Sequence, residues 1–401
     1  MITTLAVENY RSLRSLAVPL APLTVVTGAN GTGKSSLYRS LRLLADAARN
    51  GAVAALAREG GLPSTLWAGP ETIGRAVREG TYPVQPVVRG KPVSLRLGFG
   101  GDDFSYAIDF GLPSADGRES AFALDPEIKR ESIWHGPLLR PAAVLCERDN
   151  GIVRIRADRR TWSEPQAIRP YDSMLSEFAD PRQAPEVLRV REQVRSWRFY
   201  DHIRTDAAAP ARASQVGTRT PVMSHDGADV AAALQTIRET GDAAALDLAI
   251  DLAFPGSRVA VESEGGGRLG LRLHQHGLLR PLRAPELSDG TLRYLLLTAA
   301  LLTPRPPELM IINEPETSLH PELLAPLAQL IAAAAERSQV IAVSHAQTLV
   351  NALHRATEAA GIAAGTIELI KDFGETRVAG REPLDGPAWR WPERSRTAVR
   401  R

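Results

Sequence analysis

Apolar residues recur along this chain with two different spacings, one typical of strands and one typical of helices, and together they predict a mixed α/β fold. Period-two alternation, typical of strands with one buried face, predicts strands over residues 2–9 and 13–20. The same pattern predicts an antiparallel set between residues 84 and 157, with strands at 94–99, 104–110, 121–128, 142–148 and 151–157. Asp149, Asn150 and Gly151 are a turn signal that joins the last two as a hairpin.

Helical spacing takes over between about residues 170 and 255 and predicts helices at 184–203, 229–240 and 242–254. Strands return at 258–263 and 268–275. Strands and helices then alternate, with a helix from Thr291, a strand at 310–312, a helix after Pro321, a strand at 340–344 and a helix near Thr348. A hairpin is predicted over 366–380. This order fits a nucleotide-binding core that is split around a helical insertion.

An apolar strand at 23–27 and an amphipathic helix at 35–49 enclose the most informative stretch, GANGTGKS from Gly28 to Ser35. It matches G-x-x-x-x-G-K-[ST], the phosphate-binding loop, in the strand–loop–helix context that this loop requires. Its glycines let successive N–H groups point at a polyphosphate at the helix N-terminus. Lys34 would reach the β- and γ-phosphates, and the Ser35 hydroxyl would ligate Mg²⁺. We therefore expect the chain to bind a nucleoside triphosphate rather than to carry an accidental glycine-rich turn.

Three later segments carry polar residues at the ends of apolar elements. Ser288 and Gly290 start an apolar helix in LSDGTLR, where a hydroxyl, backbone N–H groups and the helix dipole form an anion site or, alternatively, a plain helix cap. The apolar strand ELMII runs into Asn313 and Glu314, and a second buried strand ends at Ser344 and His345. Each segment alone also fits ordinary structure, but all follow the phosphate loop in one order.

In chain order, LSDGTLR, the strand that runs into Asn313 and Glu314, the residues from Thr317 to Pro321 and the strand that ends at His345 resemble four motifs of ABC-type ATPases. These motifs are the signature, Walker B, the D-loop and the switch histidine. The opening LAVENYRSLRSL and the NEPETSLHP segment resemble RecF/SMC-like members, including stand-alone bacterial AAA/ABC ATPases and the ATPase part of OLD-family proteins. Transporter subunits usually show DEPT-SALD in place of NEPETSLHP. The resemblance implies an ABC-type P-loop NTPase core with an antiparallel β subdomain and a helical insertion.

The resemblance also implies a set of site residues and a mechanism. ATP would be bound by Gly28, Ala29, Asn30, Gly31, Thr32, Gly33, Lys34, Ser35, Ser36 and Arg11, and completed by Ser288 and Gly290 of a second subunit in a homodimer. Glu314 would polarise the attacking water and His345 would sense the γ-phosphate. Ser35 and Asn313 would hold Mg²⁺, directly or through water. Asn313 replaces the usual aspartate, so slow ATP hydrolysis is expected. The Q-loop glutamine is unassigned, with Gln85 and the segment from Trp67 to Gly69 as alternatives.

Composition narrows the class of protein. With 44% hydrophobic and 23% charged residues, no apolar run of membrane-spanning length and no signal peptide, the chain is expected in the cytoplasm without a membrane partner. The single cysteine, Cys146, excludes an intrachain disulfide and is expected in the core. His274 and His276 share a strand face, which we interpret as solvated rather than metal-binding. We expect four parts: 1–165, the helical insertion 166–256, 257–380 and a flexible basic tail 381–401.

Two hypotheses for the biological role stay open. In the first, the dimer acts on DNA in repair or genome maintenance, through Trp389, Trp391 and a set of arginines at Arg189, Arg191, Arg195, Arg198 and Arg204. The alternative for these residues is a solvated helix face and a disordered tail. In the second hypothesis, the ATPase regulates a separate effector protein in a phage-defence-type system, since too few residues follow His345 for a nuclease fold. A transporter subunit is a distant third.

Overall fold

The computed structural model describes residues 1–49, 51–69, 94–113, 120–157, 161–178, 180–382 and 385–393. These form two compact units. Unit 1 contains Met1–Leu20, Gly28–Ser196 and Ile367–Arg401, and unit 2 contains Ala21–Thr27 and Trp197–Thr366. The predicted four-part division of the chain stays a prediction.

Unit 1 is built on an eight-stranded antiparallel sheet with the order β2-β1-β4-β5-β6-β7-β8-β9. Its strands are β1 (Ile2–Tyr10), β2 (Leu13–Pro19), β4 (Leu95–Gly101), β5 (Phe104–Gly111), β6 (Glu127–His135), β7 (Val144–Asp149), β8 (Ile152–Ile155) and β9 (Gln166–Ala167). The predicted hairpin is present, since Asp149 pairs with Ile152 around Asn150 and Gly151. The strand predicted at 121–128 is wrong over most of its length, because residues 121–124 form turns and the strand starts at Glu127.

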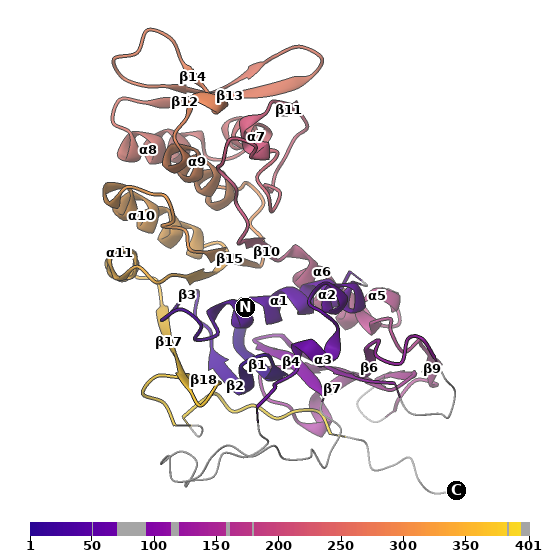
Figure 1. Ribbon diagram of the computed structural model, residues 1–401. Helices are drawn as coiled ribbons and strands as arrows, with labels where there is room; N and C mark the ends of the chain where they lie inside the picture. Colours follow the sequence, from indigo (N-terminus) through magenta and orange to yellow (C-terminus); the bar gives the residue numbers. More distant parts are fainter. Residues whose placement is uncertain are drawn as a thin grey trace, which may run out of the picture. The chain divides into compact units, whose positions relative to one another are not determined.

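Helices cover one side of this sheet. The α1 helix (Lys34–Ala47) packs against β1 and β4 (Figure 1). The α6 helix (Pro185–Ser196) packs against β5. Shorter helices are α2 (Ala52–Arg58), α3 (Leu62–Thr65) and α5 (Met174–Glu177), with a 3₁₀ turn at Pro141–Ala143. The hairpin of β17 (Ala364–Asp372) and β18 (Glu375–Val378) pairs Leu369 with Val378, as expected for 366–380.

The C-terminal segment of unit 1 lies on the sheet. The ring of Trp389 lies 5.6 Å from that of Trp134 and 5.3 Å from that of Trp391. A Cβ at Gly98 would lie 2.6 Å from the Trp389 ring, so the strand needs a glycine there. Arg130 donates a hydrogen bond to the Pro392 carbonyl at 3.0 Å. Trp389 and Pro392 therefore lie on the sheet, whereas residues 394–401 of the predicted tail lie outside the described part.

Unit 2 contains four parallel strands in the order β10-β15-β16-β3. These are β10 (Arg198–Tyr200), β15 (Leu309–Asn313), β16 (Gln339–Val343) and β3 (Leu23–Gly28, whose last residue belongs to unit 1). The helix predicted over 184–203 is too long, because α6 ends at Ser196 and Arg198 starts β10. Aromatic residues at 199 and 200 favour the strand.

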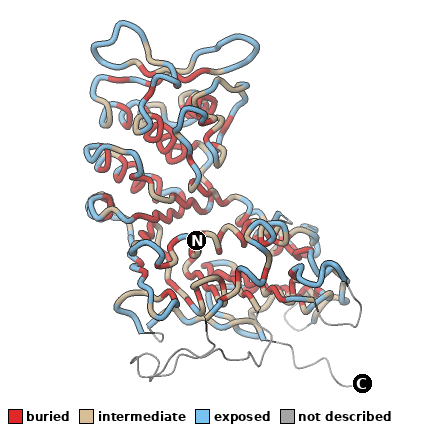
Figure 2. The backbone as a smooth tube through the Cα atoms, viewed as in Figure 1, coloured by how far each residue is buried: buried red, intermediate tan, exposed pale blue. Residues whose placement is uncertain are grey.

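Helices pack with these strands into the apolar core of unit 2. They are α7 (Val230–Thr240), α8 (Ala243–Ala253), α9 (Asp289–Leu301), α10 (Leu324–Ala335) and α11 (Gln347–Ala360). The α10 helix packs against both α9 and α11, and α9 is buried along nearly its whole length (Figure 2). Leu23 and Val25 of β3 join this core.

A small antiparallel sheet completes unit 2. It contains β11 (Gln215–Val216), β12 (Arg258–Ser263), β13 (Arg268–His274) and β14 (Leu282–Arg283). Short 3₁₀ turns lie at Pro210–Arg212, Ala284–Glu286 and Pro321–Leu323. The turn at 284–286 leads directly into α9, the helix that carries the predicted signature segment.

Candidate functional site

The phosphate loop of unit 1 has the backbone conformation that its glycines predict. Gly28, Gly31 and Gly33 have φ values of 140°, 80° and 105°, which L side chains rarely adopt. Space is a second constraint, since a Cβ at Gly33 would lie 2.3 Å from Thr376 Oγ1. The loop opens directly into α1, so its N–H groups lie at a helix N-terminus, where phosphate binds readily.

The side chain of Lys34 is held by backbone carbonyls of the phosphate loop. Its Nζ donates to the Gly28 carbonyl at 2.5 Å and to the Ala29 carbonyl at 3.0 Å, and only 7% of the residue is exposed. Ser35 is exposed in the first turn of α1, with Ser36 half-buried beside it. The lysine ammonium, the glycine backbone and the open serine hydroxyl fit a triphosphate with Mg²⁺, for which hydroxyl oxygens are suitable ligands.

Sequence analysis missed the residues that support the loop from the β17–β18 hairpin. Thr376 Oγ1 is buried and donates to the Thr32 carbonyl at 2.7 Å, and it lies 2.8 Å from Ser12 Oγ. Lys371 Nζ donates to the Gly31 carbonyl at 3.1 Å. Thr376 lies more than 340 positions from the loop along the chain, so no local pattern signals these contacts.

Arg11, expected to contact ATP, is paired within unit 1. Its Nη2 lies 2.7 Å from Glu59 Oε2, and the Tyr10 hydroxyl donates to the same carboxylate at 2.8 Å. Arg11 has a φ of 52°, and its N–H donates to the Thr65 carbonyl. Gln85, one Q-loop candidate, lies outside the described residues. The other begins at Trp67, whose N–H donates to the Asn9 carbonyl.

In unit 2, the parallel pairing of β15 and β16 brings two predicted site residues together. Asn313 pairs with Val343, and the Glu314 N–H donates to the Val343 carbonyl at 2.7 Å. Glu314 has a φ of 46°, a strained conformation of the kind found at functional sites. The turn leaves Glu314 Oε1 3.7 Å from His345 Nδ1, so the predicted catalytic carboxylate and switch histidine are neighbours.

Glu316 is the third member of this cluster, and sequence analysis assigned it no place. Its Oε1 accepts hydrogen bonds from Ser344 Oγ at 2.6 Å and from the N–H groups of His345 and Ala346 at 3.2 and 3.3 Å. It also lies 3.5 Å from His345 Nδ1. The side chain is 7% exposed, and among the described residues Oε2 has no hydrogen-bond partner. A buried carboxylate thus fixes the backbone that presents His345.

The predicted signature segment starts α9 in the same unit. Ser288 is the exposed N-cap, and its Oγ accepts from the Thr291 N–H at 3.1 Å. The helix cap, one of the two alternatives from sequence, is therefore present at the start of α9. Gly290 lies against the predicted D-loop, because a Cβ there would be 2.6 Å from the Ser318 carbonyl oxygen.

Arg293 joins α9 to the turn that carries Glu314. Its Nη2 donates to the Glu314 carbonyl at 2.7 Å, and its Nη1 donates to the Ile203 carbonyl at 3.3 Å. The residue is 8% exposed, and this burial lowers the pKa of its guanidinium, with Glu316 and Glu314 opposing the shift. The start of α9 and the end of β15 are thus connected by one buried side chain.

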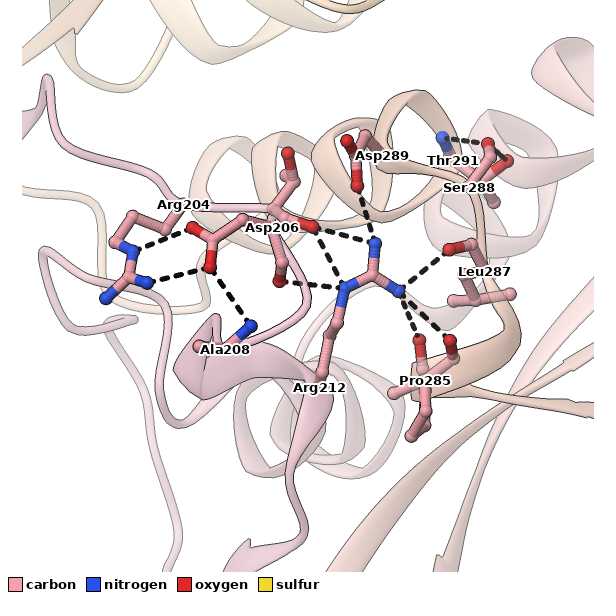
Figure 3. Close-up of polar contacts among 11 residues, drawn as sticks. Arg204, Asp206, Ala208, Arg212, Pro285, Leu287, Ser288, Asp289 and Thr291 are labelled. Atoms are coloured by element: carbon pink, nitrogen blue, oxygen red, sulfur yellow. Dashed lines mark hydrogen bonds and ion pairs between the residues drawn. The ribbon is translucent and has the colours of Figure 1, made fainter.

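Arg212 holds the segment that precedes α9. Figure 3 shows its guanidinium surrounded by carbonyl oxygens and by the Asp289 carboxylate. The Leu287 carbonyl accepts from Nη1 at 2.8 Å, and Asp289 Oδ1 accepts from Nη2 at 2.7 Å. No sequence signal identified this residue.

The remaining predictions concern metal ligands and the single cysteine. In the described part of the chain, no three His, Cys, Asp or Glu residues are grouped to hold a metal ion. Asn313 offers an amide oxygen at the end of β15, a donor that Mg²⁺ accepts. Cys146 is 1% exposed and lies in the core, and burial raises the pKa of its thiol. No helix among the described residues combines the length and apolar character needed to span a bilayer.

Known proteins share this fold and part of this sequence. A family model described as "AAA domain, putative AbiEii toxin, Type IV TA system" matches residues 23–351. An SmcHead bound to the C-winged helix domain of ScpA has a TM-score of 0.51 and 14% identity, over 94% of this chain and 96% of that chain. An Smc head domain with an extended coiled coil, bound to the C-terminal domain of ScpA derived from Pyrococcus furiosus, has a TM-score of 0.51 and 13% identity, over 94% and 95%.

A shorter match concerns a curated protein. The OLD nuclease of Thermus scotoductus is 41% identical over 44 residues, which are 11% of this chain and 8% of that protein. The match therefore spans less than a tenth of its length. Together these findings confirm the predicted fold class and the resemblance to SMC-like and OLD-like ATPases.

Proposed function

Because the chain belongs to the family described as "AAA domain, putative AbiEii toxin, Type IV TA system" and is an ATPase of the AAA/SMC-head type, we propose that it acts as a nucleotide-gated homodimer. In this proposal, ATP bound by one subunit is completed by the signature segment of the other. Hydrolysis then separates the two, so that ATP serves as a clamp signal in DNA repair or genome maintenance.

Each predicted residue has a role in this proposal. Gly28–Ser35 and Lys34 bind the phosphates, with Arg11 in support, and Ser288 and Gly290 of the second subunit contact the γ-phosphate. Ser35 and Asn313 would hold Mg²⁺, directly or through water, and the ion would supply positive charge beside the phosphates. Glu314 polarises the attacking water, and His345 contacts the γ-phosphate. Because Asn313 carries no charge, turnover is slow.

One observation carries the proposal: Glu314 and His345, far apart in sequence, lie 3.7 Å apart at the ends of paired parallel strands. A carboxylate and an imidazole at that separation can share a water or a proton. Glu316, 3.5 Å from the same imidazole, adds a second negative charge where Asn313 has none.

The test is ATP turnover by the purified protein, with and without single- and double-stranded DNA. Glu314→Gln should reduce turnover at least about a hundredfold, the scale of a lost general base, while nucleotide binding persists. DNA stimulation that disappears in this variant supports the clamp. Native turnover in Glu314→Gln would contradict the assignment, and turnover indifferent to DNA would contradict the DNA role.

A second function is favoured by the names of the similar proteins. The description of the matching family names a putative toxin of a type IV TA system, and the short curated match is a nuclease. In this alternative, the ATPase regulates a separate effector protein. Turnover that ignores DNA but changes when a co-purifying protein is added back would favour it.

A further inference from the structure

The backbone before α9 is stabilised by a side chain from a distant part of unit 2. Arg212 lies 77 positions before Asp289, and its side chain is 10% exposed. All three of its guanidinium nitrogens donate hydrogen bonds (Figure 3). A guanidinium has five donors in a fixed planar arrangement, which suits it to several carbonyl oxygens at once.

The contacts connect two loops. On one side, the Thr205 carbonyl accepts from Nη2 at 2.7 Å and from Nε at 2.9 Å. On the other, the Ala284 and Leu287 carbonyls accept from Nη1 at 3.0 and 2.8 Å. The carbonyls of residues 284 and 287 flank the 3₁₀ turn that directs the chain into Ser288. Arg212 therefore fixes the direction in which α9 begins.

The same guanidinium also compensates a charge. Asp289 follows Ser288 at the first position of α9, and its carboxylate would compete with a phosphate for the positive end of the helix. Arg212 Nη2 binds Asp289 Oδ1 at 2.7 Å and offsets this negative charge. An anion that approaches Ser288 and Gly290 then meets a neutral pair beside the helix N-terminus.

From these contacts we propose that Arg212 is a positioning residue for the signature segment and acts on the nucleotide bound by the partner subunit. The inference rests on the proposed nucleotide-gated dimer. Each subunit of that dimer contributes Ser288 to one site and Lys34 to the other. The inference requires that Arg212 support the site with the Ser288 of its own subunit, and not the site with the Lys34 of its own subunit. This difference between the two sites makes the inference testable.

The experiment mixes two inactive variants. Arg212→Met is expected to reduce turnover about a hundredfold, the cost of a site displaced by about 1 Å. Lys34→Ala removes phosphate binding in its own subunit but keeps an intact signature segment. In a mixed dimer, the phosphate loop of the Arg212→Met subunit meets the intact signature of the Lys34→Ala subunit. An equal mixture should recover turnover to within about fourfold of the native protein, because half of the dimers then hold one complete site.

Controls separate failure of this inference from failure of the dimer. Ser288→Arg mixed with Lys34→Ala should also recover turnover, and Glu314→Gln mixed with Lys34→Ala should not. If the Ser288→Arg mixture recovers and the Arg212→Met mixture does not, the role of Arg212 is wrong and the dimer stands. If neither recovers, the dimer itself is wrong, and the inference falls with it.

Two further variants guard against a folding defect. Arg219→Met changes an exposed arginine nearby and should keep native turnover. Arg212→Lys keeps the charge with fewer donors, and it replaces Arg212→Met in the mixture if the latter does not fold. Native turnover by Arg212→Lys and Arg212→Met alone would overturn the inference without any mixing.

Discussion

Two arginines, one in each unit, bind loops by the same means but with different surroundings. In unit 1, Arg148 donates to the carbonyls of Asn150, Arg169, Pro170 and Asp172 and pairs with Glu131 at 2.9 Å. In unit 2, Arg212 donates to a similar set of carbonyls and pairs with Asp289. Both side chains of the Arg148 pair are 0% exposed, whereas Asp289 is 57% exposed.

Because the Arg148 pair is buried and Asp289 is exposed, we expect a structural role for Arg148 and a functional role for Arg212. Removal of Arg148 would leave the Glu131 carboxylate charged and buried, and such a group is costly. Removal of Arg212 would leave Asp289 in water, where exposed ion pairs contribute about 0–1 kcal/mol. The same side-chain chemistry is thus expected to support folding stability in unit 1 and site geometry in unit 2.

The largest expected effect is on the Arg148 pair. Arg148→Met should lower the free energy of unfolding by about 3–5 kcal/mol, because Arg148 is the only cationic partner of Glu131 among the described residues. Urea unfolding followed by circular dichroism measures this change. The matched control is Arg140→Met, an exposed arginine that should unfold like the native protein. A loss below about 1 kcal/mol in Arg148→Met, the range of an exposed pair, would remove the contrast between the two arginines.

An intermediate effect is expected at Glu316, a buried carboxylate that serves the site of unit 2. Glu316→Gln should lower kcat about tenfold to a hundredfold, because it removes the negative charge 3.5 Å from His345 Nδ1 and loosens the turn. ATP binding, followed with a fluorescent analogue, should stay near native. Glu322→Gln, at an 89% exposed side chain, is the control. Unchanged kcat in Glu316→Gln would place Glu316 with the structural carboxylates instead.

The smallest expected effect is that of Arg212→Met on unit 1, which we would follow by the rate at which a buried thiol is labelled. Cys146 lies two residues from Arg148, is 1% exposed and has a thiol pKa raised by burial, so thiol reagents should label it slowly in the folded protein. Arg148→Met should speed this labelling. Arg212→Met should leave the labelling rate within about twofold of native, as independent sites do. Faster labelling in Arg212→Met would show that its effect is not confined to the site.

Sequence patterns predicted the elements that a local rule specifies. The phosphate loop needs glycines at positive φ, a strand before it and a helix after it, and these all lie within one short stretch. The strands that end at Asn313 and Val343 were predicted as buried strands because they are short and continuously apolar. The parallel pairing of these two strands then places Glu314 beside His345.

Contacts between distant segments could not be predicted in this way. Arg212 and Asp289, Thr376 and Thr32, or Trp389 and Trp134 meet only because the chain folds, and none lies in a periodic pattern that depends on the other. The tail illustrates this limit. Its composition indicated a flexible segment, yet Trp389 contacts the sheet through shape and apolar area, which composition does not report.

The position of β3 decides whether unit 2 can be produced as a fragment of the chain. Residues 21–27 come from the N-terminal part of the sequence but pair with β16 in unit 2, where Leu23 and Val25 join the core. A fragment cut at residues 197 and 366 would expose the apolar edge of β16, which is a template for aggregation. Unit 2 therefore cannot be separated by truncation alone, because a fragment of residues 197–366 would lack the strand that residues 21–27 supply.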